Sequence, residues 1–441
     1  MKKIFKLFVL FVVCLVWNLV INSIQNDEIW NYGFAHNIYL GLIPYRDFNM
    51  VIPPLYPFLM SLPFHIFGSS MLVLHVENAI ILTFFFYIVY KLIGDKVYIL
   101  GLIIVFCSNS ITFPSYNLFI VFLVVLLIYL EKINYNDYII GFIIGLCILT
   151  KHTIGFFILL PSIYYIVKDR KKVFKRIIGC FVPCIIFLLF LVCFDALPQF
   201  VDLCILGLFD FGHENTTGFN FGYFYFLLYL LVGFLIVRKR KHDISNYYYF
   251  AFASMMLPLF DFHHNCLAYL LLFMQILSII NIEYISKLKP AIFILIVGIG
   301  IIMFVSNNQG FKIDYPNSIN HFEYRYIRAD SIKFTNNIVN YINKNNDKEY
   351  IFVASDAYYF RIVLDDKMSY LDLINSGNFG YNGSDKIIKM INERNDKNAV
   401  FVISPDDLNE KCQADKKAVK YIIEKGTKID TVQIYDFYIL E

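Results

Sequence analysis

A polar stretch near the N-terminus carries residue types that could form a catalytic site. Residues 25–68 read QNDEIWNYGFAHNIYLGLIPYRDFNMVIPPLYPFLMSLPFHIFG, and Asp27 and Glu28 directly follow a long apolar segment. A carboxylate at a membrane surface, beside an apolar groove, can act as a general base that accepts a proton from a hydroxyl or an amine. Acidic residues are also favoured in the first turn of a helix. Both interpretations of Asp27 and Glu28 remain open.

The second polar group of this stretch is Tyr45-Arg46-Asp47, which follows a proline. Arg46 could meet a phosphate, or Arg46 and Asp47 could form only an ion pair within the loop. Pro53-Pro54 and Pro57 are expected to interrupt any helix here and to turn the chain toward the next apolar segment. We therefore expect Tyr45, Asp47 and Pro54 to shape the site or to contact an acceptor.

Lys151-His152-Thr153 lies at the outward end of the apolar segment 137–150. The positive-inside rule disfavours a lysine there. A cation beside a histidine at the outer leaflet is what a lipid phosphate leaving group would need. The alternative is that Lys151 only extends its ammonium group to the interface. Lys151 and His152, together with Arg46, are our candidate phosphate ligands.

Further polar residues lie in two other loops expected on the same side. We expect Asp210, His213 and Glu214 to shape the site or to contact an acceptor. Their types could also hold a divalent ion such as Mg²⁺ or Mn²⁺. Asp261, His263 and His264 occupy a turn between two apolar segments. Ordinary loop polarity explains each group separately, and the spacing is unspecific. Metal binding therefore remains unknown, and the sequence establishes no cofactor.

Composition identifies a polytopic membrane protein. Hydrophobic residues make up 58% of the 441 residues and charged residues 17%, and the mean hydropathy is +0.59. A soluble domain of this size would not have these values. The nine cysteines contain no CxxC pair, so neither a disulfide framework nor a cysteine zinc site is supported. The expected surroundings are a lipid bilayer, with no nucleic acid partner.

Hydropathy predicts about eleven transmembrane helices. They cover residues 4–24, 71–90, 97–113, 117–131, 137–150, 154–167, 177–197, 221–237, 247–260, 265–282 and 290–305. The first segment lacks a small-residue cleavage site and is read as an uncleaved span. Basic clusters such as KDRKKVFKR (168–176) and RKRKHD (238–243) fall in alternate loops, which places the N-terminus in the cytoplasm and the chain after residue 305 outside.

Residues 306–441 have a polar, mixed-charge composition. YIFVAS (350–355), NAVFVIS (398–404) and VQIYDFYIL (432–440) read as strands, and amphipathic helices alternate with them. The sequence thus predicts a polytopic α-helical membrane domain, residues 1–305, with an outer loop at 25–70. A small exterior α/β domain, residues 306–441, follows.

The outer loop resembles that of the GT-C membrane glycosyltransferases that use polyprenyl-phosphate sugars, the group of protein O-mannosyltransferases and the lipid A aminoarabinose transferase. Members have an acidic residue after the first span, a G-x-x-P-Y-x-D segment, then prolines and a run ending in F-G. The matching residues here are Gly41, Pro44, Tyr45, Arg46, Asp47, Pro54 and Phe67-Gly68, with Asp27-Glu28 in the acidic position. LTKHTIGFFILLP (149–161) is similar to a lysine-containing element of the same proteins. A D-x-D triplet is absent, which puts metal dependence in doubt.

The resemblance implies an inverting sugar transfer in a bacterial plasma (inner) membrane. An exterior acceptor, which could be a cell-envelope glycan, a lipid or a protein, would attack the anomeric carbon of a polyprenyl-phosphate-linked sugar. Asp27 would take the proton and the lipid phosphate would leave. Two alternatives remain: a flippase or exporter of lipid-linked saccharides, and a non-catalytic cell-envelope scaffold. Few ionisable residues lie at mid-depth in the predicted spans, which counts against a transport pathway.

Overall fold

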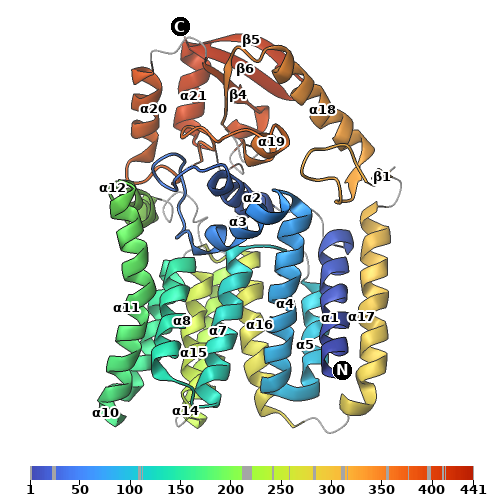
Figure 1. Ribbon diagram of the computed structural model, residues 1–441, viewed down its shortest axis with the longest axis vertical. Coiled ribbons are helices and arrows are strands. Elements are labelled where there is room, and N and C mark those ends of the chain that lie inside the picture. The colour runs from blue at the N-terminus through green and yellow to red at the C-terminus, as the bar shows by residue number, and fades with distance from the viewer. Residues whose placement is uncertain are drawn as a thin grey trace.

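The chain is mostly helical, and several of its helices are long and apolar enough to cross a membrane (Figure 1). The computed structural model describes residues 2–21, 26–107, 111, 113–210, 221–240, 243–257, 259–281, 285–308, 313–314, 316–353, 357–375, 377–394, 399–409, 412 and 414–440. Within these ranges, five segments meet the length and apolarity that a span needs: Met71–Val105, Arg170–Cys193, Phe221–Lys239, Phe262–Ile279 and Lys287–Ser306. The protein is an integral membrane protein.

The helices of the apolar part follow the predicted segments closely. They are α1 (Lys2–Val16), α4 (Met71–Ile93), α5 (Val97–Phe106), α7 (Tyr116–Lys132), α8 (Asp137–Thr150), α9 (His152–Leu159), α10 (Tyr164–Lys168), α11 (Arg170–Cys193), α12 (Leu197–Phe200), α14 (Phe221–Lys239), α15 (Ser245–Ala251), α16 (Phe262–Ile279) and α17 (Ile285–Asn308). Several are shorter than a bilayer requires. The count of eleven spans therefore stays a prediction.

Helices α8 and α11 lie side by side (Figure 1), and glycines line their contact. A Cβ atom added to Gly141 would lie 2.1 Å from the carbonyl oxygen of Arg176, and one added to Gly179 would lie 2.1 Å from that of Tyr138. These backbones approach so closely that only glycine fits. Small residues permit such contacts between membrane helices, where close van der Waals packing replaces the hydrophobic effect as the driving force.

A layer of two short helices caps one end of the bundle, α2 (Asn26–Tyr39) and α3 (Leu55–Phe67). The expectation that Pro53-Pro54 and Pro57 would prevent a helix here is wrong. Pro54 is the N-cap of α3 and Pro57 lies in its first turn. Backbone N–H groups of the first turn have no partner within the helix, so a proline there removes nothing that the helix uses.

The C-terminal part contains a four-stranded sheet with the order β3-β4-β6-β5. Its strands are β3 (Glu349–Phe352), β4 (Ala399–Ile403), β5 (Gly426–Val432) and β6 (Tyr435–Leu440), and only β3 and β4 are parallel. A separate antiparallel pair joins β1 (Ile313–Asp314) and β2 (Ile327–Arg328). The helices are α18 (Ala329–Lys344), α19 (Ala357–Val363), α20 (Gly383–Glu393) and α21 (Lys416–Lys425). The strand β5 was not predicted from the sequence, and its side chains are mostly exposed and polar.

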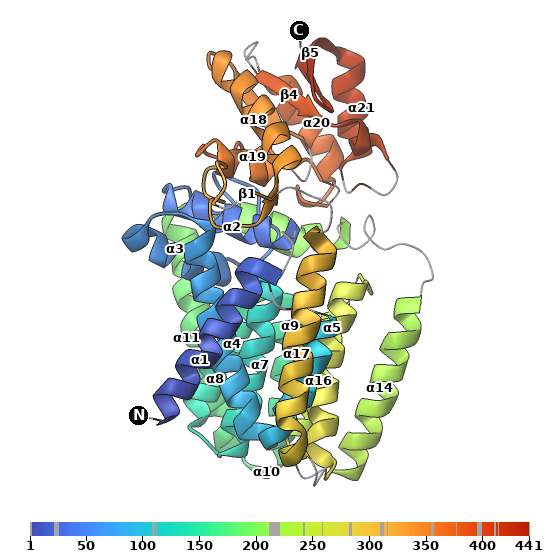
Figure 2. The ribbon, with the colours of Figure 1, turned by 90° about the vertical axis from the view of Figure 1, so that its right-hand side faces the viewer.

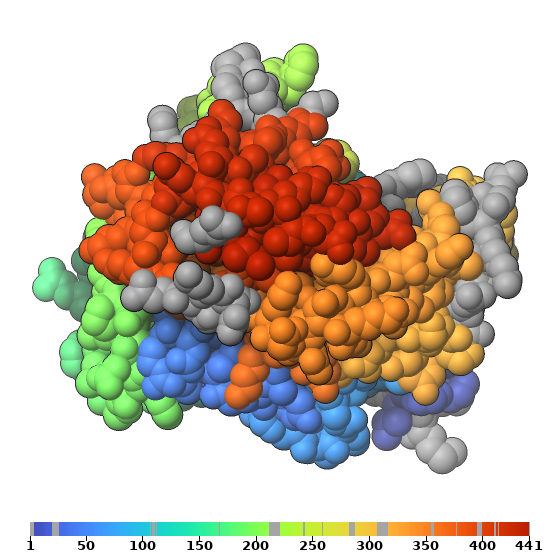
Figure 3. All heavy atoms as spheres, turned by 90° about the horizontal axis from the view of Figure 1, so that it is seen from above, coloured from blue at the N-terminus to red at the C-terminus, as the bar shows by residue number. Residues whose placement is uncertain are grey.

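The α2–α3 layer lies between the helical bundle and the C-terminal part (Figures 1 and 2). All residues of α2 from Asn31 to Asn37 are buried. Gly33 meets α19 so closely that a Cβ atom there would lie 2.1 Å from the Tyr358 ring. Seen from above, the C-terminal part covers most of this face, and the outer loop emerges along one margin (Figure 3). The N-terminus lies at the opposite end of the molecule from the C-terminus (Figure 2).

Candidate functional site

Asp27 and Lys151 meet through a single asparagine. The Asn117 side chain donates from Nδ2 to Oδ2 of Asp27 at 3.3 Å and accepts at Oδ1 from the Lys151 ammonium at 2.9 Å. Asp27 stands in the first turn of α2, Asn117 in the first turn of α7, and Lys151 between α8 and α9. Three segments distant in the sequence thus bring a carboxylate and an ammonium group to one amide.

A histidine and a second carboxylate complete the surroundings of Lys151. Its Nζ lies 3.0 Å from Nε2 of His264, and Nδ1 of His264 lies 2.7 Å from Oδ2 of Asp261. Because an ammonium group can only donate, Nε2 accepts and the Nδ1–H donates to Asp261. Asp261 is also the N-cap of α16, since its Oδ1 accepts from the His264 backbone N–H at 2.8 Å. Lys151 is therefore held in one place by a chain of hydrogen bonds.

Aromatic rings border the same cluster. The Lys151 ammonium lies 5.4 Å from the centre of the Tyr116 ring, within cation–π range. His263 stacks on Phe113 with ring centres 5.5 Å apart, and its Nε2 lies 3.7 Å from Oδ2 of Asp27. We call Asp27, Asn117, Lys151, Asp261, His263 and His264 the Asp27–Lys151 cluster.

Burial and neighbouring charges shift the pKa values of this cluster in opposite directions. Burial lowers the pKa of Lys151 to about 8, while the carboxylates of Asp27 and Asp261 oppose that shift. Burial raises the pKa of Asp261, but its hydrogen bond with His264 and the nearby His264 ring outweigh this and bring the pKa down to about 2. Asp261 thus remains an anion, and Lys151 keeps its charge at neutral pH.

Glu28 does not share the surroundings of its neighbour Asp27. Its carboxylate is fully buried, 2.6 Å from Nε2 of His75 and 3.6 Å from the guanidinium group of Arg325. Arg325 also donates to the backbone carbonyl of Asn18. Glu28 therefore joins α2 to α4 and to the start of the C-terminal part. Adjacent side chains on a helix point about 100° apart. This is why Asp27 and Glu28, which the sequence suggested as one acidic site, have different neighbours.

The Tyr45-Arg46-Asp47 segment forms contacts of its own. Arg46 makes two hydrogen bonds to the Asp47 carboxylate, at 2.7 and 2.9 Å, and its side chain is 43% exposed. This is the loop ion pair given as the alternative for these residues. Tyr45 is fully buried and donates to the Ile52 carbonyl at 2.8 Å. Tyr45, Asp47 and Pro54 thus shape the outer loop, and no described contact joins Arg46 to Asp27 or Lys151.

Of the remaining candidate residues, the structure describes His152 and Asp210. His152 begins α9 next to Lys151, and both of its ring nitrogens are buried. Asp210 accepts a hydrogen bond from the Asn382 backbone N–H at 2.6 Å, so it contacts the loop before α20. His213 and Glu214 lie outside the described residues. The expectation that Asp210, His213 and Glu214 shape the site or contact an acceptor therefore stays a prediction, and metal binding by them remains open.

Asn117 is the member of the cluster that the sequence did not indicate. It lies one residue after Tyr116, directly before the apolar run 118–130 of α7, and a lone asparagine there carries no motif. Asp261, His263 and His264 were visible as a polar turn, but nothing in their spacing pointed to Lys151. The available signal was topological: all of these residues belong to loops or helix ends predicted on one side of the membrane.

Comparison with known proteins identifies the fold. No protein-family model matches the sequence, and no curated protein sequence does. Among solved structures, ArnT from Cupriavidus metallidurans bound to undecaprenyl phosphate superposes with a TM-score of 0.58 at 9% identity, over 99% of this chain and 98% of that one. Its apo state gives 0.58 at 10% identity, over 99% and 97%. AglB from Archaeoglobus fulgidus, with an inhibitory peptide and a dolichol-phosphate, gives 0.48 at 12% identity, over 99% and 74%. The chain has the GT-C membrane fold that the outer-loop resemblance predicted.

Proposed function

We propose that this protein transfers a sugar from a polyprenyl-phosphate-linked donor to an acceptor outside the cell, with inversion at the anomeric carbon. The observation that carries the proposal is the Asn117 bridge, which holds a candidate general base, Asp27, and a candidate phosphate ligand, Lys151, side by side. The acceptor would be a cell-envelope glycan, a lipid or a protein.

The reaction assigns one role to each of these residues. Asp27 accepts the proton of the acceptor hydroxyl, whose oxygen forms a bond to the anomeric carbon. The bond between that carbon and the phosphate oxygen breaks on the opposite face, which inverts the configuration. Negative charge grows on the departing lipid phosphate, and the Lys151 ammonium stabilises it. Asn117 and His264 are positioning residues, because they fix the ammonium through hydrogen bonds at 2.9 and 3.0 Å.

The fold comparison supports a lipid-phosphate donor. The ArnT structure that superposes over 98% of its length contains undecaprenyl phosphate. The proposal further places the protein in the plasma membrane of a bacterium, with the N-terminus in the cytoplasm. The Asp27–Lys151 cluster would then face outward, where no nucleotide sugar is present and a lipid-linked donor is needed.

The decisive variant is Asp27→Asn, which keeps the shape of the side chain and removes its ability to accept a proton. We expect sugar transfer from short-chain polyprenyl-phosphate sugars to fall by about 10²-fold or more. Asp385→Asn is the matched control and should retain the parent activity, because Asp385 lies on α20 in the C-terminal part, is 72% exposed and pairs with Lys417 at the surface. Wild-type turnover by Asp27→Asn would contradict the assignment of the base.

A further inference from the structure

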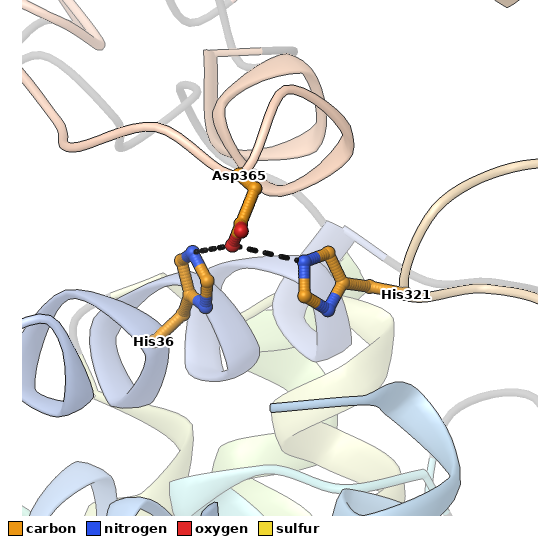
Figure 4. Close-up of side chains that lie close together, drawn as sticks. All are labelled: His36, His321 and Asp365. Carbon is orange, nitrogen blue, oxygen red and sulfur yellow. Dashed lines mark hydrogen bonds and ion pairs between the residues drawn. The ribbon is translucent and has the colours of Figure 1, made fainter. Parts of the chain in front are cut away.

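A second cluster of ligand-type side chains lies away from Asp27, where α2 meets the C-terminal part. It consists of His36 near the end of α2, His321 in the loop before β2, and Asp365 just after α19 (Figure 4). Nε2 of His36 lies 3.5 Å from Oδ1 of Asp365, and Nε2 of His321 lies 3.1 Å from the same oxygen. Ligand atoms around a tetrahedral zinc ion are about 3.3 Å apart, because Zn–N bonds measure about 2.0–2.1 Å.

The two rings turn their Nε2 atoms inward because their other nitrogens are already bound. Nδ1 of His321 lies 2.6 Å from the carbonyl oxygen of Ser69, so it must carry a hydrogen and donate it. Nδ1 of His36 lies 2.8 Å from the hydroxyl of the same serine. In a neutral imidazole with the hydrogen on Nδ1, Nε2 holds a lone pair. His321 has this form, in which histidine binds a metal with a second residue fixing the tautomer. His36 has it when its Nδ1 donates to the Ser69 hydroxyl.

A carboxylate oxygen and such a lone pair repel each other unless a proton or a metal ion lies between them. The His36 side chain is only 1% exposed, and its Nε2 has no hydrogen-bond partner among the described residues. The His321 loop is held firmly, since its backbone carbonyl accepts from the Met71 N–H at 2.9 Å. Asp365 is 57% exposed, which leaves one side of the cluster open to water.

We propose that His36, His321 and Asp365 bind a divalent transition-metal ion of the Zn²⁺ class, with water in the fourth position. Two imidazole nitrogens and one carboxylate oxygen suit zinc better than Mg²⁺ or Ca²⁺, which prefer oxygen ligands. This site is separate from the Asp210-His213-Glu214 group, and it does not depend on the proposed transfer reaction.

The metal would join three segments that are far apart in the sequence. It would link the outer loop to the loop before β2 and to the end of α19, and so fix α2 against the C-terminal part. His36 and Asp27 lie on the same helix, nine residues apart, or about 13 Å at 1.5 Å per residue. The ion would therefore set the position of the helix that carries Asp27 without contacting the Asp27–Lys151 cluster.

The test measures metal binding on the full-length protein, purified in detergent with a tag that lacks histidine. After chelator treatment and dialysis, Zn²⁺ titration should restore a single equivalent of bound metal per chain and raise the melting temperature. His36→Gln and Asp365→Asn should each weaken zinc binding by more than about tenfold and abolish the rise. His65→Gln, at an exposed histidine of the adjacent α3, is the matched control and should behave as the parent.

A second measurement needs no substitution. Co²⁺ in place of Zn²⁺ should give the strong visible absorption of a tetrahedral site with nitrogen and oxygen ligands, and excess Zn²⁺ should remove it. Unchanged zinc stoichiometry and affinity in His36→Gln and Asp365→Asn would overturn the proposal. So would displacement of bound Zn²⁺ by an equal concentration of Mg²⁺, or a weak octahedral Co²⁺ spectrum in the parent.

Discussion

Lys151 carries a charge that pH can remove, and this gives the proposed donor site a pH dependence. Burial lowers the Lys151 pKa to about 8, so the ammonium is present below that pH and is lost as pH rises through it. At about one unit above the pKa only about a tenth of the molecules remain charged. We expect the apparent KM for the lipid-phosphate donor to rise about tenfold between about pH 7 and pH 9, measured in steady-state kinetics.

Lys151→Arg provides the control for this effect, because a guanidinium group stays protonated throughout the same range. Its different shape should weaken donor use at pH 7, but the dependence on pH should flatten. Lys151→Met should lose donor affinity at every pH. If the apparent KM for the donor rose with pH to the same extent in the parent and in Lys151→Arg, the titrating group would be another residue.

Glu28 and Asp27 are adjacent, yet substituting Glu28 should lower stability whereas substituting Asp27 should lower activity. Glu28→Gln leaves the His75 ring and the Arg325 guanidinium group buried with an uncharged partner. Breaking a buried ion pair costs about 3–5 kcal/mol, so the melting temperature in detergent should fall clearly. Asp27→Asn should melt close to the parent. If Glu28→Gln lost transfer activity without losing stability, Glu28 would be the base.

At the scale of elements, the glycine contacts between α8 and α11 predict a steric effect. Gly141→Ala places a methyl group against the Arg176 backbone, and the helices must separate. Overpacking of this kind costs about 1–3 kcal/mol, which thermal unfolding in detergent would detect. Gly298→Ala on α17 is the matched control, since nothing lies within 4 Å of the added atom. Equal melting temperatures for the two variants would contradict the observed helix contact.

The sequence predicted the helices better than the strands. Runs of apolar residues that must lie in lipid have a strong signal, so α4, α11, α14, α16 and α17 coincide with predicted segments. The strand β5 was not predicted because it lies at the edge of the sheet and exposes Lys428, Asp430 and Thr431. An edge strand has no need for the alternating apolar pattern on which strand prediction depends.

The site was predictable as a set of candidates but not as a cluster. The positions of the basic loops predict on which side of the membrane each segment end lies, so Asp27 and Lys151 could be placed on the same face. Asp27 and Lys151 are joined by Asn117 of a third segment, and His264 of a fourth holds Lys151; their hydrogen bonds to the Lys151 ammonium measure 2.9 and 3.0 Å. Such distances depend on how helices pack, and no spacing within one segment encodes them.

At the scale of the whole molecule, the predicted orientation can be tested directly. Reporter fusions after Arg240 should report a cytoplasmic position, because the RKRKHD loop is strongly basic. Fusions after Asn320 should report the exterior, on the side where the C-terminal part covers the Asp27 helix. A cytoplasmic signal from the second fusion would reverse the topology and remove the basis for an exterior acceptor.

The burial of the middle of α2 limits how the C-terminal part can be exchanged between proteins. Seven consecutive residues, Asn31 to Asn37, have no free face, and Asn49 donates to the carbonyls of Tyr370 and Asp372 in the C-terminal part at 3.0 and 2.8 Å. We therefore expect that the C-terminal part cannot be exchanged on its own at residue 306. A chimera that imports the C-terminal part of another protein with this fold should assemble only when that protein's counterpart of residues 25–70 is imported with it, so the two distant segments should have to be exchanged together.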